Sequence, residues 1–320
     1  MKVLILHASA GGGHKRAAEA LSKAFQLECP SVQVAVHDIL EFTGPVFRKT
    51  YADGYLRLVR KAPELWGYLY ERSDKKATLP WRKEVRAVFN KINTIRFSRF
   101  FSQFAPDAVV CTHFMPLELL STMIREKKTA VPVFGCVTDF AVHSLWIIDR
   151  VTAFYVATDE ACRTLIRRGQ HPDAVRVTGI PIDPVFARRE PAAAMRRKLG
   201  LREDVPAILI LSGGFGVGPT LALIRSFRDA PRRCQLIVVA GANQALQRDA
   251  EREAAALPVP ARVFGFVSNI HELMDAADVA VGKPGGLTTS EALAKGLPML
   301  IVDPIPGQEQ RNAEYLLENG

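Results

Sequence analysis

Short apolar runs rich in Val and Ile, separated by helix-like segments, are the feature of this sequence that most restricts its fold. The runs lie at residues 3–6, 32–36, 108–111, 131–137, 151–156, 175–179, 207–211, 235–240, 262–264, 279–281 and 298–302. Strands that are apolar along their whole length are buried on both faces, as in parallel sheets covered by helices. The sequence therefore predicts an α/β fold built from parallel βαβ units.

The chain length and a change in composition predict two domains. At about 150 residues per domain, 320 residues are enough for two. Residues 184–205 are rich in Arg and Ala and contain Pro191, which is typical of a linker. We therefore expect Rossmann-like domains at 1–183 and 206–320, joined by a linker at 184–205, with a cleft between them. The chain stops where a further βα connection would begin, so we expect the C-terminal part of the second domain to be incomplete.

Charge and aromatic residues are concentrated in one segment. The formal net charge is +9, and residues 42–104 contain 14 Lys or Arg, five Asp or Glu and 13 of the 26 aromatic residues. Basic and aromatic side chains together suit an anionic lipid surface; nucleic acid is disfavoured because no nucleic-acid motif accompanies them. The alternative is a pair of helices with a buried aromatic face and a solvated basic face. As membrane contacts we select Arg57, Arg60, Lys61 and Trp66.

Cysteine usage and the N-terminus bear on location. The five cysteines are scattered, which argues against a disulfide framework or a zinc site and favours a reducing compartment. The apolar run at residues 3–6 is too short for a signal peptide, and no stretch approaches about 20 apolar residues. We therefore expect a cytoplasmic protein, bound peripherally at the inner face of the plasma membrane.

Two glycine-rich segments each lie between a predicted strand and a helix. Gly213, Gly214, Phe215 and Gly216 follow the run at 207–211. Glycines let the backbone approach a phosphate, and a helix N-terminus supplies N–H donors. The alternative is a tight turn; a P-loop is excluded because no Gly-Lys-Ser/Thr follows.

The second glycine-rich segment spans residues 282–291 and carries a carboxylate. Gly285 and Gly286 open a predicted helix that bears Glu291. One interpretation is that the turn holds phosphates while Glu291 accepts hydrogen bonds from a vicinal diol. The other is a capping box formed by Thr288 and Glu291, which needs no ligand.

Two residues of the first domain are candidates for acid–base chemistry. His14 follows three glycines at a helix start, where it is either catalytic or a solvated loop residue. Asp139 is either a base itself or the partner of His143, or makes only a local hydrogen bond. The remaining histidines show no metal-ligand spacing, and no Asp-x-Asp motif occurs. The sequence predicts no metal and no cofactor, so backbone N–H groups and helix ends would stabilise a leaving group.

Several motifs together resemble one glycosyltransferase family. Residues 284–291, 296–298 and 306–313 look like its donor signature. The family contains monogalactosyldiacylglycerol synthases, processive diacylglycerol glucosyltransferases and the N-acetylglucosaminyltransferase that makes lipid II. Residues 11–14 resemble the acceptor-domain loop of the glycerolipid branch, and residues 138–140 with His143 and Trp146 resemble its next motif. The resemblance extends over nearly the whole chain.

The resemblance implies a GT-B fold and assigns roles to residues. Glu291 would bind ribose, Gly285 and Gly286 the diphosphate, and the Gly213 loop the transferring phosphate, with Thr288 nearby. The same motifs imply further roles: Phe266 and Val267 would lie against uracil, Gln308 and Glu309 would hold sugar hydroxyls, and Gly12, Gly13, His143 and Trp146 would face the acceptor.

The implied reaction is inverting transfer of a hexose from UDP-glucose or UDP-galactose to diacylglycerol or another lipid at a membrane surface. His14 or Asp139 would remove the acceptor proton. Three alternatives remain open at this point. They are N-acetylglucosaminyl transfer to a polyprenyl-linked acceptor, a UDP-sugar epimerase of the same architecture, and an inactive nucleotide-binding module.

Overall fold

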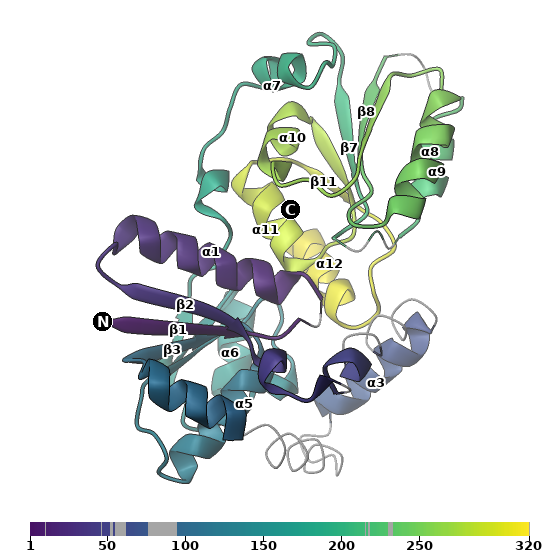
Figure 1. Ribbon diagram of the computed structural model, residues 1–320. Helices are drawn as coiled ribbons and strands as arrows, with labels where there is room; N and C mark the ends of the chain where they lie inside the picture. Colours follow the sequence, from purple (N-terminus) through teal and green to yellow (C-terminus); the bar gives the residue numbers. More distant parts are fainter. Residues whose placement is uncertain are drawn as a thin grey trace. The chain divides into compact units, whose positions relative to one another are not determined.

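The computed structural model describes residues 1–9, 11–45, 47–51, 54, 62–75, 95–214, 216, 218–229 and 233–319. The chain divides into two compact units, one formed by Met1–Asp183 with Pro306–Gly320 and the other by Pro184–Ile305. Each unit is built on a parallel β-sheet with helices packed on it (Figure 1). The predicted α/β class is confirmed.

The first unit contains a six-stranded sheet with the order β2-β1-β3-β4-β5-β6, and all its pairings are parallel. The strands are β1 (Lys2–His7), β2 (Gln33–Asp38), β3 (Ala108–Cys111), β4 (Val133–Cys136), β5 (Ala153–Val156) and β6 (Val175–Val177). The chain proceeds from β1 to β2 on one side and then returns to β3 on the other. Such a reversal leaves a crevice at the carboxyl ends of β1 and β3, where ligands bind in open α/β sheets.

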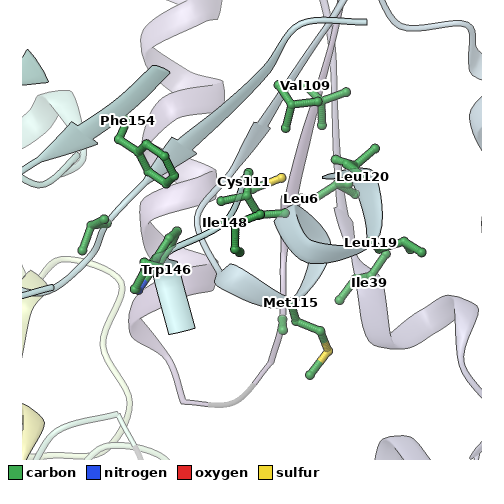
Figure 2. Packing of buried hydrophobic residues seen from close by; sticks show 14 of the residues in the cluster. Leu6, Ile39, Val109, Cys111, Met115, Leu119, Leu120, Trp146, Ile148 and Phe154 are labelled. Atoms are coloured by element: carbon green, nitrogen blue, oxygen red, sulfur yellow. The ribbon is translucent and has the colours of Figure 1, made fainter. Parts of the chain in front are cut away.

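The centre of this sheet is buried on both faces, which explains the continuous apolar runs of its inner strands. On one face Val3 and Ile5 pack against Ala18 of α1 (Gly13–Glu28). On the other, Leu4 and Leu6 belong to a larger core. Helices α5 (Phe114–Arg125) and α6 (Asp159–Arg167) contribute to that core. Figure 2 shows Leu6, Val109 and Cys111 pointing from their strands into this cluster, together with Trp146.

The first unit also contains the helices α3 (Pro63–Lys75) and α12 (Gln308–Asn319). Short 3-10 turns lie at η1 (Ile39–Phe42), η2 (Ser144–Trp146) and η3 (Pro172–Ala174). Residues 95–104 are helical as well, and residues 76–94 lie outside the described residues. In the described part of the chain, no helix combines the length and the apolar character needed to cross a membrane.

The segment Pro306–Gly320 packs in the first unit, whereas the sequence placed residues 206–320 together. The reason lies in contacts that the linear sequence does not reveal. Arg311 Nη2 lies 2.8 Å from Asp74 Oδ2 of α3, and the ring of Tyr315 stacks on Phe140 at 5.2 Å. The turn before α12 also fits closely against α3, because a Cβ added to Gly67 would lie 2.5 Å from Pro306 Cβ.

The second unit contains a five-stranded parallel sheet with the order β11-β10-β7-β8-β9. Its strands are β7 (Ala207–Leu211), β8 (Gln235–Val239), β9 (Ala261–Phe264), β10 (Val279–Gly282) and β11 (Met299–Ile301). Its helices are η4 (Pro184–Ala187), α7 (Ala192–Lys198), α8 (Thr220–Arg225), α9 (Gln244–Ala255), α10 (Ile270–Ala276) and α11 (Gly286–Ala294). The strand order reverses between β7 and β10, which gives this sheet a crevice of the same kind.

Residues 184–205, expected to be a linker, belong to the second unit. The buried side chain of Arg196 fastens α7 to that unit, because its Nε donates to the Ala276 carbonyl at 2.9 Å and its guanidinium pairs with Asp278. The same carboxylate accepts from the Ala207 N–H at the start of β7, at 2.7 Å.

Candidate active site

A cavity of about 510 Å³ lies in the first unit. Most of its walls are aromatic or aliphatic, with a few polar groups. The lining residues are His14, Tyr51, Trp66, Leu69, Tyr70, Arg72, Ser73, His113, Phe114, Asp139, His143, Leu145, Trp146 and Gln308. Six of the residues selected from the sequence therefore meet in one place: His14, Trp66, Asp139, His143, Trp146 and Gln308. An apolar cavity with few convergent polar groups is typical of a small-molecule site.

His14 reaches the cavity from the first turn of α1, at the crevice between β1 and β3. Gly11 has a φ of +98°, a conformation that favours glycine, and Gly12 is the N-cap of the helix. The Nδ1 atom of His14 lies 2.8 Å from the carbonyl oxygen of Thr112 and 2.9 Å from the hydroxyl of Thr138. A carbonyl only accepts, so Nδ1 carries the proton and Nε2 is the basic nitrogen.

Burial lowers the pKa of His14 below its ordinary value, although the nearby charge of Asp139 opposes this shift. Burial raises the pKa of Asp139 above its ordinary value, and the charge of His14 and a hydrogen bond from Asn312 oppose that rise. A neutral imidazole beside a carboxylate is suited to accept a proton and then to be stabilised as an imidazolium. The arrangement can therefore serve as a general base.

His143 lines the same cavity, but its hydrogen bonds fasten α3 instead of contacting Asp139. Its Nε2 lies 3.0 Å from the Tyr70 carbonyl oxygen and 3.1 Å from Ser73 Oγ, and its Nδ1 accepts from the Leu145 N–H at 3.2 Å. Burial lowers the pKa of His143, which favours its neutral form. In the part of the chain that the structure describes, both ring nitrogens of His143 bond to groups other than Asp139. The interpretation of Asp139 and His143 as a pair is therefore wrong.

His113 is a site residue that the sequence analysis did not select. It is the N-cap of α5, where its Nδ1 accepts from the Met115 N–H at 3.0 Å, and its ring meets that of His14 edge-on at 4.6 Å. Burial holds the pKa of His113 well below its usual range. The available signal was its place directly after β3, since the carboxyl ends of neighbouring parallel strands share one edge of a sheet.

In the second unit, the Gly213 loop follows β7 at the corresponding crevice. Gly213 and Gly216 have φ values of +69° and +62°. A Cβ on Gly216 would lie 2.5 Å from Asn243 Cβ, so only glycine fits there. Gly218, with φ +147°, lies beside Lys283 of the loop after β10. The two glycine loops thus flank the point where the strand order reverses, where a phosphate-bearing ligand is expected.

Helix α11 begins at Gly286, with Gly285 as its N-cap. Thr288 is the third helical residue and Glu291 lies a turn further on, so the capping-box interpretation is wrong. Glu291 is only 2% exposed. A buried carboxylate on the helix that starts at the glycine turn is not explained by capping and remains a candidate ligand residue.

The other selected residues are distributed as follows. Phe266 and Val267 follow β9, with Phe266 74% exposed and Val267 half-buried. Glu309 is buried at the start of α12 beside Gln308, and Gly13 is the first residue of α1. Phe215, Arg57, Arg60 and Lys61 lie outside the described residues. No group of three or more His, Cys, Asp or Glu side chains in the described part of the chain is arranged to hold a metal ion.

Comparison with known proteins identifies the family. Residues 14–182 match the monogalactosyldiacylglycerol (MGDG) synthase family, and residues 217–320 match the glycosyltransferase family 28 C-terminal domain. A processive diacylglycerol beta-glucosyltransferase of Bacillus mycoides is 32% identical over 324 residues, covering 100% of this chain and 80% of that protein. The chain belongs to the MGDG synthase family and is a UDP-sugar-dependent glycosyltransferase.

Solved structures agree with a GT-B fold. Acinetobacter baumannii MurG matches with a TM-score of 0.61 and 15% identity, over 100% of this chain and 84% of that one. The UDP-GlcNAc 2-epimerase of Neisseria meningitidis bound to UDP-GlcNAc matches with a TM-score of 0.55 and 14% identity, over 100% and 91%. Because an epimerase shares the fold, the fold alone does not separate transferases from epimerases, and the family match makes that distinction.

Proposed function

We propose that the protein transfers glucose or galactose from a UDP-sugar to diacylglycerol, with inversion at the anomeric carbon. The observation that carries this proposal is the convergence of His14, Asp139 and Gln308 on one mostly apolar cavity. Aromatic side chains line it, among them Trp66, Phe114 and Trp146. Diacylglycerol presents a single hydroxyl next to apolar chains, which fits a basic nitrogen inside an apolar wall.

His14 Nε2 removes the proton of the acceptor hydroxyl, and Asp139 stabilises the imidazolium that results. The acceptor oxygen then forms its bond to the anomeric carbon as the bond from that carbon to the UDP oxygen breaks. Backbone N–H groups of the Gly213 and Gly285 loops receive the charge on the leaving diphosphate, and Glu291 holds the ribose. Gln308, in the cavity lining, contacts the transferred sugar.

A peripheral membrane position follows from the same proposal, because diacylglycerol resides in a bilayer. Helix α3 provides part of the cavity wall through Trp66, Leu69 and Tyr70. Its exposed face carries Leu65 and Tyr68, which are 50% and 58% exposed. Large apolar side chains that gather on a surface mark sites of protein or membrane contact. We assign this face to contact with the lipid surface at the cytoplasmic side of the membrane.

The second candidate is transfer of N-acetylglucosamine to a polyprenyl-linked acceptor. The likeness to MurG favours it only at the level of the fold. Curated relatives named processive diacylglycerol beta-glucosyltransferase favour the glycerolipid acceptor instead. The likeness to an epimerase likewise shows only a shared fold.

The test is to incubate the purified protein with UDP-glucose, UDP-galactose or UDP-N-acetylglucosamine and with vesicles containing either diacylglycerol or a polyprenyl-linked acceptor. Mass spectrometry of the extracted lipid identifies the product. We expect a hexosyl-diacylglycerol of β configuration by NMR, formed by the wild type and lost in His14→Ala. A product on the polyprenyl acceptor alone, or sugar isomerisation without lipid product, would overturn the proposal.

A further inference from the structure

Asn312 is a fully buried amide on α12 whose polar atoms face the segment that carries Asp139. Its Oδ1 accepts from the Phe140 N–H at 3.0 Å. Its Nδ2 donates to Asp139 Oδ1 at 3.3 Å. With 0% exposure, this side chain is not positioned to contact a sugar or a lipid directly. Its influence on the reaction therefore has to pass through its neighbours.

The orientation of this amide is fixed by chemistry. A backbone N–H can only donate, so the atom that faces Phe140 is the oxygen of Asn312 and the NH₂ group faces Asp139. If the amide were turned over, its NH₂ group would face the Phe140 N–H, and two donors would point at each other. An NH₂ group supports an acceptor, and an ionised carboxylate is acceptor-only. The contact thus favours the charged form of Asp139.

The backbone next to Asp139 is held from two sides. The Phe140 carbonyl accepts from Thr158 Oγ1 at 2.9 Å, while α12 holds the Phe140 N–H through Asn312 and stacks Tyr315 on its ring. Thr158 acts only on the backbone of this segment. Asn312 bonds to this backbone and also to the Asp139 carboxylate. Variants of Thr158 and Asn312 therefore separate a structural effect on the segment from an electrostatic effect on Asp139.

We propose that Asn312 is a positioning residue for proton transfer, acting through Asp139 by holding its carboxylate charged and directed toward His14. The inference rests on the proposed function, in which His14 is the base and Asp139 stabilises the imidazolium. Without the hydrogen bond from the Asn312 NH₂ group, less opposes the effect of burial, and the pKa of Asp139 rises further. A protonated Asp139 no longer stabilises the imidazolium, so turnover falls while donor binding persists.

A double-mutant cycle tests whether Asn312 acts through Asp139. The variants are Asn312→Ala, Asp139→Ala and the double variant, assayed for kcat and for the KM of the UDP-sugar. We expect Asn312→Ala to lower kcat by roughly tenfold to a hundredfold, the range of a misplaced catalytic group, with the KM of the donor unchanged. In the Asp139→Ala background the same substitution should leave kcat almost unchanged. An equal loss in both backgrounds, or a loss expressed in KM, would overturn the inference.

Asn312→Asp provides a second variant of nearly the same shape. Its carboxylate still accepts from the Phe140 N–H but opposes Asp139 with a like charge, so the acid limb of the kcat–pH profile should move to higher pH. An acid limb that stays in place would contradict the inference. Thr158→Val is the matched control, because it removes the bond to the Phe140 carbonyl and the N-cap of α6 without touching the donor to Asp139. It should lower the unfolding temperature and leave the pH profile where it is.

Failure of the inference can be told apart from failure of the proposed function. If His14→Ala retains normal turnover, the acid–base assignment itself is wrong. If His14→Ala is inactive but the cycle of Asn312 and Asp139 is additive, the assignment stands and Asn312 is only a packing residue.

Discussion

Arg311 of α12 and Asp74 of α3 form an ion pair with 2.8 Å between Nη2 and Oδ2, across 237 positions of sequence. The same carboxylate also pairs with Arg168 at 3.0 Å and accepts from the Ser144 N–H at 2.8 Å. Arg311 lies over the ring of Tyr70 at 5.5 Å. One buried carboxylate thus joins α3, α12 and the turn that carries His143, and these elements supply Ser73, Gln308 and His143 to the cavity lining.

The first prediction concerns this carboxylate and stability. Burial would raise the pKa of Asp74, but the hydrogen bond and charge of Arg311, together with His143, outweigh it and the pKa lies below its ordinary value. A carboxyl whose pKa is lowered on folding stabilises the protein above its unfolded value of about 3.9, and this contribution is lost as the pH falls through the folded pKa. Asp74→Asn should therefore lower the free energy of unfolding by about 2–3 kcal/mol at pH 7.

The measurement is urea unfolding of wild type and Asp74→Asn at pH 7 and at acidic pH. The difference between them should shrink toward zero as the pH is lowered past the folded pKa of Asp74. A difference that stays constant down to strongly acidic pH would mean that the charge of Asp74 does not stabilise the fold.

The second prediction concerns the proposed base. His14→Ala should lower kcat by about 10²–10⁴-fold, the usual contribution of a general base, with little change in UDP affinity. Because burial lowers the pKa of His14, the acid limb of the wild-type pH profile should lie below about 6.5, the ordinary value for histidine. The base is active when neutral, so activity should rise with pH through that limb. His113→Gln, which can still accept at the α5 N-cap, serves as the neighbouring comparison.

The third prediction concerns the donor. Glu291→Gln keeps the shape of the side chain but replaces an oxygen that can accept from the ribose, so UDP affinity should fall by about tenfold or more, the worth of one hydrogen bond to a charged group. Isothermal calorimetry with UDP measures this. Ser290→Ala, which loses a 2.8 Å bond to the Gly286 carbonyl on the same helix, is the control and should bind UDP normally. Unchanged affinity in Glu291→Gln would remove Glu291 from the donor site.

The fourth prediction concerns the exposed face of α3. Leu65→Ser should weaken binding to vesicles, since burying a leucine side chain contributes about 1.5–3 kcal/mol when complete. Leu317→Ser is the matched control, because Leu317 is 80% exposed and lies on α12. Co-sedimentation with vesicles compares them. Equal losses in both variants would show that general surface hydrophobicity, and not the α3 face, drives binding.

The fifth prediction concerns the charge of residues 42–104. Each basic residue near an anionic surface contributes about 1 kcal/mol, so reversing Arg57, Arg60 and Lys61 to Glu should abolish binding to anionic vesicles. Added salt should weaken binding of the wild type. Reversal of Arg125, Lys127 and Lys128 makes the same change in net charge outside this segment and should have a much smaller effect. If neutral and anionic vesicles bind equally, the charge serves another purpose.

The sequence by itself determined the strands and the places where ligands gather. Each predicted apolar run overlaps an observed strand, because the strands of a parallel sheet covered by helices leave an apolar signature in the sequence. The positions of Gly213 and Gly216 at a strand-to-helix turn were predictable for a similar reason. A positive φ or a close backbone approach is a requirement of the turn itself, and glycine is the residue that satisfies it. The family motifs added the resemblance on which the site residues were selected.

Only the tertiary structure decided which side chains meet. The proton on His14 Nδ1 is fixed by a carbonyl 98 positions away, and His143 is committed to α3 by contacts 70 and 73 positions away. The interpretation of Thr288 as a helix cap was wrong because α11 starts two residues earlier, at Gly286. Asn312 stood within the recognised signature, yet its partners Asp139 and Phe140 became visible only when α12 packed in the first unit. Periodicity reports how each segment is buried, whereas hydrogen-bond partners depend on how distant segments are brought together, which is a property of the folded chain alone.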